Sequence, residues 1–167
     1  MTVTLDRLLA SREARADFQK ELLESYPGKT LVCLTVIVPG PVKRNQQSLV
    51  VAQAAVTALI SAFSGSMLHL ELRDLPTGYE GYFVTSLSNL EAKELTCGLE
   101  DSHPLGRLFD LDVITADGTP LSRQAVGKSP RKCLICGQEA LWCMRNRTHS
   151  IDELNARIRE MIEAYVQ

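Results

Sequence analysis

Two aspartates separated by one residue, Asp110 and Asp112, are the strongest candidates for chemistry in this sequence. The apolar residues Phe109, Leu111 and Val113 alternate with them and predict a β-strand, in which both carboxylates face the same side. Side by side, the two carboxylates repel each other and are costly to remove from water, and a divalent cation relieves both costs. The pair therefore predicts a Mg²⁺ site that shares its coordination shell with substrate phosphates.

The residues just before this strand favour phosphate chemistry. Gly106 would allow a close backbone approach, and Arg107 would steady phosphate charge beside the carboxylates. His103 is a candidate for acid–base work because it stands close to the aspartates in the sequence. Without these neighbours, two aspartates on a strand would suit a solvent-facing edge equally well.

A second group of expected substrate contacts follows an apolar run that ends at Pro39-Gly40-Pro41. Ligands often bind where strands end, so we expect Gly40, Lys43 and Arg44 to contact the substrate. We also expect Arg131, in the basic segment further along the chain, to contact the substrate. A rigid, solubilising turn and a solvated basic face are the alternatives for these residues.

Cys133, Cys136, Cys143 and His149 have the ligand types and spacing of a structural Cys₃His zinc site. Zinc would tie the basic segment to the start of the last helix. The alternative is a set of reduced, partly buried cysteines on a turn and a short helix. Five cysteines are an odd number, which argues against a disulfide framework.

The elements that must position these residues predict one α+β domain over residues 1–167, with a Cys-rich basic segment and terminal helix at about 123–167. Apolar periodicity and capping boxes predict helices at 4–26, 47–63, 88–100 and from 150 onward. The first helix carries its apolar residues at Leu5, Leu8, Leu9, Phe18, Leu22 and Leu23. Strands are expected at 31–38, 67–72, 81–87 and 108–115, with a hairpin turn at 116–119. We expect a mixed or antiparallel sheet covered by helices, of nucleotidyltransferase-like type.

Composition excludes some classes of protein. The 167 residues are 45% hydrophobic and carry a net charge of −2, which argues against a nucleic-acid-coating polycation. No apolar run reaches the length of a membrane span and no signal-peptide pattern is present, so a cytoplasmic location is expected. Residues 67–120 hold ten acidic and three basic residues, whereas residues 123–147 hold six basic and one acidic. A metal-holding acidic stretch beside a phosphate-holding basic stretch would produce this division, as would ordinary solvated surface.

The stretch Ser102-His103-Pro104-Leu105-Gly106-Arg107-Leu108-Phe109-Asp110-Leu111-Asp112-Val113 resembles the signature of the holo-citrate lyase synthase family, also called apo-citrate lyase phosphoribosyl-dephospho-CoA transferase. The likeness continues through residues 38–43 and 131–136 to Cys143, Arg145 and His149. It implies transfer of the 2′-(5″-phosphoribosyl)-3′-dephospho-CoA group from its triphosphate precursor to a serine of the citrate lyase acyl carrier subunit, with release of diphosphate. The attacking serine then belongs to the partner, and neither nucleic acid nor a membrane is involved.

Two other functions fit the residues. The same group could be transferred to a malonate decarboxylase carrier, although the Gly-Arg-Leu-x-Asp-x-Asp arrangement is similar to the citrate lyase type. The chain could instead be a non-catalytic adaptor, in which the cysteines hold zinc and the basic segment binds a partner. For the adaptor, neutral substitutions at Asp110 and Asp112 would leave function unchanged.

Overall fold

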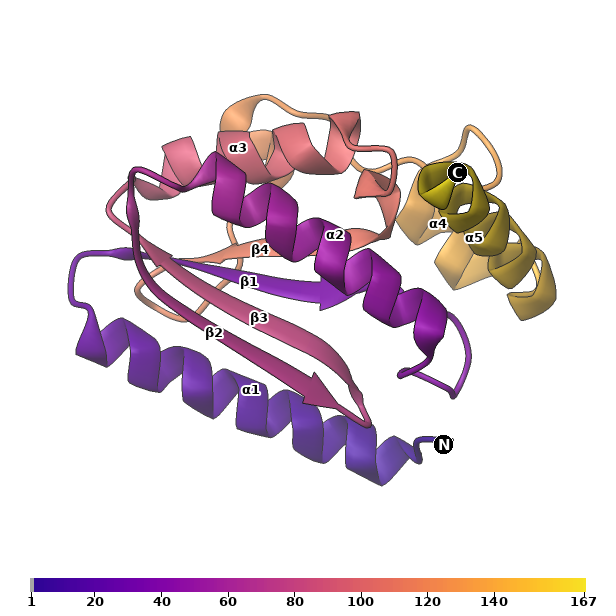
Figure 1. Ribbon diagram of the computed structural model, residues 1–167, viewed down its shortest axis with the longest axis horizontal. Helices are drawn as coiled ribbons and strands as arrows, with labels where there is room; N and C mark the ends of the chain where they lie inside the picture. Colours follow the sequence, from indigo (N-terminus) through magenta and orange to yellow (C-terminus); the bar gives the residue numbers. More distant parts are fainter. Residues whose placement is uncertain (1) are drawn as a thin grey trace.

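The computed structural model describes residues 2–167 as a four-stranded antiparallel sheet with helices on both faces (Figure 1). The strand order is β2-β3-β1-β4, so β2 and β4 are the edges. The strands are β1 (Thr30–Val36), β2 (Met67–Leu75), β3 (Gly78–Thr85) and β4 (Phe109–Ile114). The helices are α1 (Leu5–Ser25), α2 (Gln46–Ala62), α3 (Asn89–Ser102), α4 (Ala140–Asn146) and α5 (Ile151–Val166), with 3₁₀ turns η1 (Gly106–Leu108) and η2 (Arg123–Val126).

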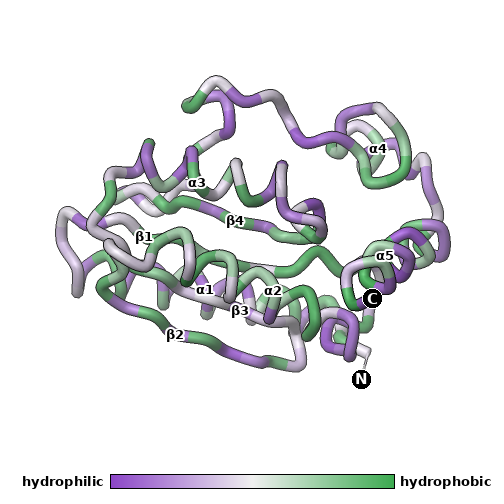
Figure 2. Tube along the Cα trace, turned by 45° about the horizontal axis from the view of Figure 1, so that its top comes forward, coloured by the Kyte–Doolittle hydropathy of each residue, from purple (hydrophilic) through white to green (hydrophobic). Residues whose placement is uncertain are grey.

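The sheet buries apolar side chains on both faces, because the central strand β1 is apolar at successive positions rather than at alternate ones. Val32 and Leu34 point to the main core beneath α2 and α3, which also holds Phe109 and Leu111 of β4. Leu31 and other side chains of the opposite face form a smaller cluster under α1. Figure 2 shows the hydrophobic residues gathered along β1, β4 and α2. Two covered faces fit a strand that is apolar throughout.

The expected single-domain α+β architecture is confirmed, with a purely antiparallel sheet. The β2–β3 hairpin is tighter than predicted, because only Pro76 and Thr77 separate the two strands. The predicted turn at 116–119 is present, and the chain returns beside β4 through two backbone bonds, from the Thr115 N–H to the Thr119 carbonyl and from the Leu121 N–H to the Val113 carbonyl. Capping boxes start α3 at Ser88 and α5 at Ser150, as the sequence indicates.

Helix α1 packs differently along its length. Its second half rests on the sheet through an apolar set made of Phe18, Leu22, Leu23 and Tyr26. Near its start, Leu5 and Leu9 are 70% and 47% exposed, although the apolar pattern predicts them on the buried face. Ser11 and Arg15 turn toward the sheet there and bond Thr77 and Glu80. The inward face becomes polar because the sheet beneath carries polar side chains at that end.

The C-terminal part attaches at one end of the sheet (Figure 1). Ile158 and Ile162 of α5 join the main core, where α5 packs against α2. The segment before α4 forms a tight hairpin closed by a bridge between Lys132 and Glu139. Among the described residues, no helix is both long and apolar enough to span a membrane.

Candidate active site and metal centre

Asp110 and Asp112 lie on the same face of β4, as strand alternation predicts, while their apolar neighbours are buried on the other face. In the ladder with β1, Asp110 stands opposite Thr35 and Asp112 opposite Cys33. The Thr35 hydroxyl donates to Asp110 Oδ2 at 3.0 Å. Both carboxylates therefore face α1, at the edge of the sheet.

The two neighbouring carboxylates form a site where a bound cation would be stabilised. Burial first, and then the neighbouring Asp110 carboxylate, raise the pKa of Asp112 to about 6. Within residues 2–167, no further histidine, cysteine or carboxylate completes a three-residue ligand set around the pair. A cation held here would take its remaining ligands from substrate and water, as Mg²⁺ does.

Asp112→Asn is expected to stabilise the protein at pH 8 without added divalent ions, by about 1–2 kcal/mol, because it removes a buried charge and a repulsion. The folded state binds this proton more tightly than the unfolded chain does. Wild type therefore gains stability as the pH falls from about 6 toward the pKa of an unfolded aspartate, so the difference from the variant should be clearly smaller at pH 5 than at pH 8. Urea unfolding at both pH values measures it, and a variant less stable than wild type at pH 8 would contradict the expectation.

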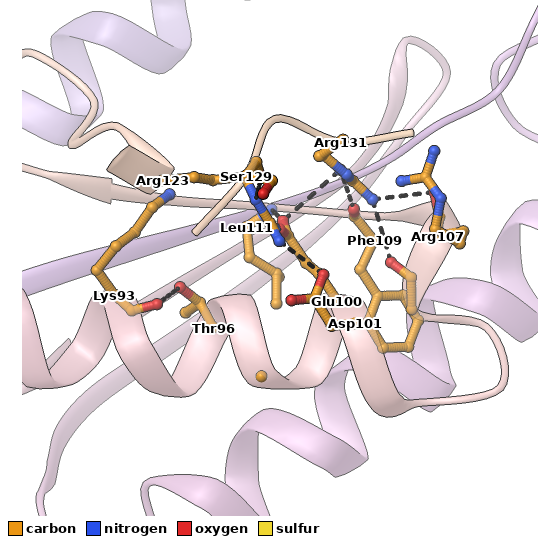
Figure 3. A network of polar contacts seen from close by, with 12 residues as sticks. Lys93, Thr96, Glu100, Asp101, Arg107, Phe109, Leu111, Arg123, Ser129 and Arg131 are labelled. Carbon is orange, nitrogen blue, oxygen red and sulfur yellow. Dashed lines mark hydrogen bonds and ion pairs between the residues drawn. The ribbon is translucent and has the colours of Figure 1, made fainter. Parts of the chain in front are cut away.

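The outer edge of β4 is closed by side chains (Figure 3). The Arg131 guanidinium donates to the Phe109 carbonyl at 2.8 Å and to the carbonyls of Gly106 and Arg107. The buried Glu100 carboxylate accepts from the Leu111 N–H at 3.0 Å and lies 3.6 Å from Arg131. These bonds satisfy edge groups that would otherwise be open to another strand. The structure thus places Arg131 where it positions the strand that carries Asp110.

Close packing of η1 against α3 requires glycine at position 106. A Cβ at this residue would lie 2.5 Å from the Glu100 carbonyl oxygen, so η1 can rest on the end of α3 only with glycine. The close approach expected at Gly106 is therefore made to α3 within the protein itself.

Gly106→Ala is expected to lower the free energy of unfolding by about 1–3 kcal/mol, because η1 must move away from α3. The matched control is Gly98→Ala within α3, where an added Cβ meets nothing within 4 Å. Alanine there should be neutral or stabilising by up to about 1 kcal/mol, since glycine weakens helix interiors. Urea unfolding of both variants checks this, and equal stability of the two would contradict the packing argument.

The basic residues near η1 face a different cavity from the aspartates. Arg107 bonds the Lys132 carbonyl, and Arg123 pairs with Glu100 and Asp101 at 2.6 Å each. With Lys128 and neighbouring residues they line a cavity of about 350 Å³ that does not include Asp110. Arg107 is therefore not brought beside Asp110, although the two are three residues apart.

His103 and Gly40 are likewise engaged away from the aspartates. The His103 ring lies 4.8 Å from the ring of Phe109, whose side chain is on the face opposite Asp110, and 5.5 Å from that of Tyr165. Its Nδ1 accepts from the Leu105 N–H, and burial lowers the pKa of the imidazole. Gly40 has a φ of +79° and packs near Ile151 at the start of α5. The structure thus does not bring His103 to the carboxylate pair.

Lys43 does reach the face that carries Asp110. Both line a cavity of about 200 Å³ between α1 and the sheet, and the Lys43 ammonium donates to the Val38 carbonyl at 2.6 Å. Arg44 turns away and forms a bidentate pair with Asp74, with both bonds 2.7 Å long.

Sequence reasoning missed further polar residues around this cavity, namely Ser11, Arg12, Arg15, Tyr79 and Glu80. Glu80 stands opposite Thr35, in the same row of the sheet as Asp110, and only 4% of it is exposed. Its carboxylate accepts from Arg15 at 3.0 Å and from the Tyr82 hydroxyl. Ser11 and Arg15, four residues apart on the helix, were the signal available in the sequence for a polar inward stripe.

The four expected zinc ligands come together. The ligand atoms of Cys133, Cys136, Cys143 and His149 all lie within 4.8 Å of one another. Cys136 Sγ is 3.4 Å from both Cys143 Sγ and His149 Nε2. In a tetrahedral zinc site with Zn–S bonds near 2.3 Å, sulfur atoms stand about 3.8 Å apart. The cluster has the composition and size for one metal ion.

The local backbone suits thiolates in this cluster. Burial would raise the pKa of Cys133, but the backbone N–H groups of Cys136 and Ile135 and the neighbouring thiols lower it to about 7. The Ile135 N–H donates to Cys133 Sγ at 3.4 Å. N–H groups that point at sulfur favour the charged form, which is the form that binds metal.

Comparison with known proteins shows which family this chain matches. Residues 3–165 match the family model described as apo-citrate lyase phosphoribosyl-dephospho-CoA transferase. A probable member from Streptococcus pyogenes serotype M18 is 36% identical over 167 residues, covering 98% of this chain and 87% of the relative. One from Vibrio cholerae (strain M66-2) is 37% identical, covering 99% and 94%. Protein CitXG of Haemophilus influenzae is 40% identical over 96% of this chain, which corresponds to 35% of that longer protein.

Proposed function

This chain belongs to the apo-citrate lyase phosphoribosyl-dephospho-CoA transferase family, and on that premise we propose that it attaches the prosthetic group of citrate lyase. It transfers 2′-(5″-phosphoribosyl)-3′-dephospho-CoA from the triphosphate precursor to a serine of the apo acyl carrier subunit and releases diphosphate. The match over residues 3–165 carries this proposal, because it includes every part of the site described above. The expected family resemblance is thereby confirmed.

Asp110 and Asp112 are the residues that we assign to Mg²⁺. Two ionised carboxylates on one face of a rigid strand offer hard oxygen ligands and leave room for phosphate oxygens. When bound, Mg²⁺ would neutralise charge on the triphosphate and on the departing diphosphate. We also propose that the fold is nucleotidyltransferase-like, because the two carboxylates lie on a strand of a helix-covered sheet.

The transfer itself is a displacement at the α-phosphorus of the precursor. The carrier's serine oxygen forms a bond to this phosphorus, and the bond to the oxygen that bridges the α- and β-phosphoryl groups breaks. The serine proton passes to a carboxylate of the aspartate pair, since His103 packs on the other face of β4. The two aspartates thus orient the reacting phosphate and receive a proton at a carboxylate oxygen.

We further propose that the Cys₃His cluster holds a structural Zn²⁺. Four ligands leave no open position for substrate, which is typical of structural rather than catalytic zinc. Cys133 and Cys136 lie in the hairpin before α4, Cys143 lies in α4, and His149 precedes α5. The metal would join three short pieces of chain that share few other contacts.

A mass measurement tests the function. The protein is incubated with Mg²⁺, the triphosphate precursor and the apo carrier of citrate lyase, and the carrier is weighed before and after. We expect a gain equal to one prosthetic group, and no gain with a carrier whose acceptor serine is alanine. The malonate decarboxylase carrier is tested in parallel. Modification of that carrier alone, or of neither, would overturn the proposal.

A further inference from the structure

Two cationic side chains line the small cavity under α1. Arg12 of α1 and Lys43 of the β1–α2 loop line it together with Asp110, and its volume is about 200 Å³. The ladder through Glu80, Thr35 and Asp110 forms its floor. A carboxylate assigned to a metal and two cations from separate segments therefore face one space.

Among the described residues these two cations are not directly paired, although the Asp110 carboxylate lines the same cavity. Within residues 2–167, neither Arg12 nor Lys43 lies within ion-pair distance of a carboxylate, whereas Arg15 beside them is paired with Glu80. Burial first, and then the charge of Arg12, lower the pKa of Lys43. Two cations that disfavour each other across a cavity form a place where an anion would be stabilised.

A second and larger cavity continues along the same helix. It has a volume of about 1100 Å³ and lies between the second half of α1, the start of α3 and residues 116–118 beyond β4. Arg15 lines the small cavity, and the next residue, Ala16, lines the large one. Asp110 of β4 lines the small cavity, and residues 116–118, which follow the end of β4, line the large one.

We propose that the small cavity binds the diphosphate leaving group through Arg12 and Lys43, and that the large cavity receives the phosphoribosyl-dephospho-CoA portion of the substrate. This inference rests on the proposed function. The cavity volumes support this assignment. The small cavity of about 200 Å³ is large enough for a diphosphate, whereas a nucleotide with a pantetheine arm needs a volume like that of the large cavity. Charge agrees in the small cavity, because arginine and lysine are the usual partners of phosphate. When the bond to the α-phosphorus breaks, the negative charge then develops next to both cations.

Calorimetric titration with magnesium diphosphate tests the small cavity on the full chain. Arg12→Gln and Lys43→Gln are each expected to weaken binding by about tenfold or more, since each removes a charged hydrogen bond. Arg12→Lys and Lys43→Arg should recover most of that loss. Arg159→Gln on α5 is the charge-matched control and should bind as wild type does. Thermal melting confirms that each variant is folded. Unchanged diphosphate binding in both glutamine variants, or none in wild type, would overturn the proposal.

Dephospho-CoA serves as the second probe and tests the division between the cavities. Arg12→Gln and Lys43→Gln should change its affinity by less than about twofold, and an equal loss for both probes would show that the division is wrong. The carrier-labelling assay keeps the two claims apart. Wild type that labels the carrier while the glutamine variants keep their diphosphate affinity removes this inference alone. Charge-dependent diphosphate binding without any labelling removes the proposed function instead.

Discussion

Asp110→Asn and Asp112→Asn are each expected to lower the rate of carrier modification by about 10³-fold or more, with the fold intact. Asparagine keeps the shape of the side chain but removes the charge that we propose to hold Mg²⁺ against the triphosphate, and charge stabilisation by a metal contributes several kcal/mol to a transition state. The carriers are weighed at timed intervals under saturating precursor. Circular dichroism and thermal melting show whether the variants are folded.

Asp152→Asn provides the control for this loss. Asp152 lies in the first turn of α5, away from the aspartate pair, and its neutralisation should leave the rate within about twofold of wild type. Near-normal labelling by both folded variants at Asp110 and Asp112 would end the assignment of the pair. It would favour the adaptor function, in which these carboxylates do no chemistry.

Substitution of a cysteine in the Cys₃His cluster is expected to have the second large effect. Cys136→Ser should abolish stoichiometric zinc and leave the hairpin at residues 132–139 and helix α4 exchanging backbone hydrogens about as fast as an unfolded segment. The reason is that structural zinc contributes folding free energy directly, and among the residues of the cluster only Cys143 is buried. Metal analysis by mass spectrometry and hydrogen exchange measure the two effects.

Cys97→Ala is the matched control for the cysteine substitution. Cys97 is buried within α3 and belongs to no ligand set, so its loss should leave the zinc content at one per chain. The sheet and its covering helices should keep their hydrogen-exchange protection in both variants, because their core is formed by other residues. Protein purified without chelators that contains no stoichiometric zinc would contradict the assignment.

The aspartate pair and the Cys₃His cluster can both be predicted from the sequence. Strand alternation puts Asp110 and Asp112 on one face as soon as β4 forms, because the period of a strand is a local property of the backbone. The Cys₃His set is also local, since its four members lie within 17 residues of chain and short hairpins and turns bring such residues together. Both groupings follow from spacing, and the structure has each of them.

The side chains that share a cavity with Asp110 come from distant parts of the chain, and the sequence did not predict all of them correctly. Arg107, three residues from Asp110, lines another cavity because η1 turns its side chain toward Lys132. Arg12 lies almost a hundred residues away in the chain and yet lines the same cavity as Asp110. Nearness in sequence decides which side chains share a strand face, but the packing of α1 on the sheet decides which side chains share a cavity.

The difference between local sequence patterns and long-range packing applies to the rest of the molecule as well. The sequence by itself determined the four strands and the four long helices in their order, the capped starts of α3 and α5, the shared face of the aspartates and the grouping of the Cys₃His residues, because periodicity, capping and spacing act over a few residues. The short helix α4 was not among the helices predicted from periodicity and capping. Only the tertiary structure decided that Arg131 and Glu100 close the edge of β4, that Gly106 serves the packing of η1 on α3, and that Arg12 and Lys43 meet near Asp110. These contacts join segments distant in the chain, and they depend on how the helices settle on the sheet once the core is formed.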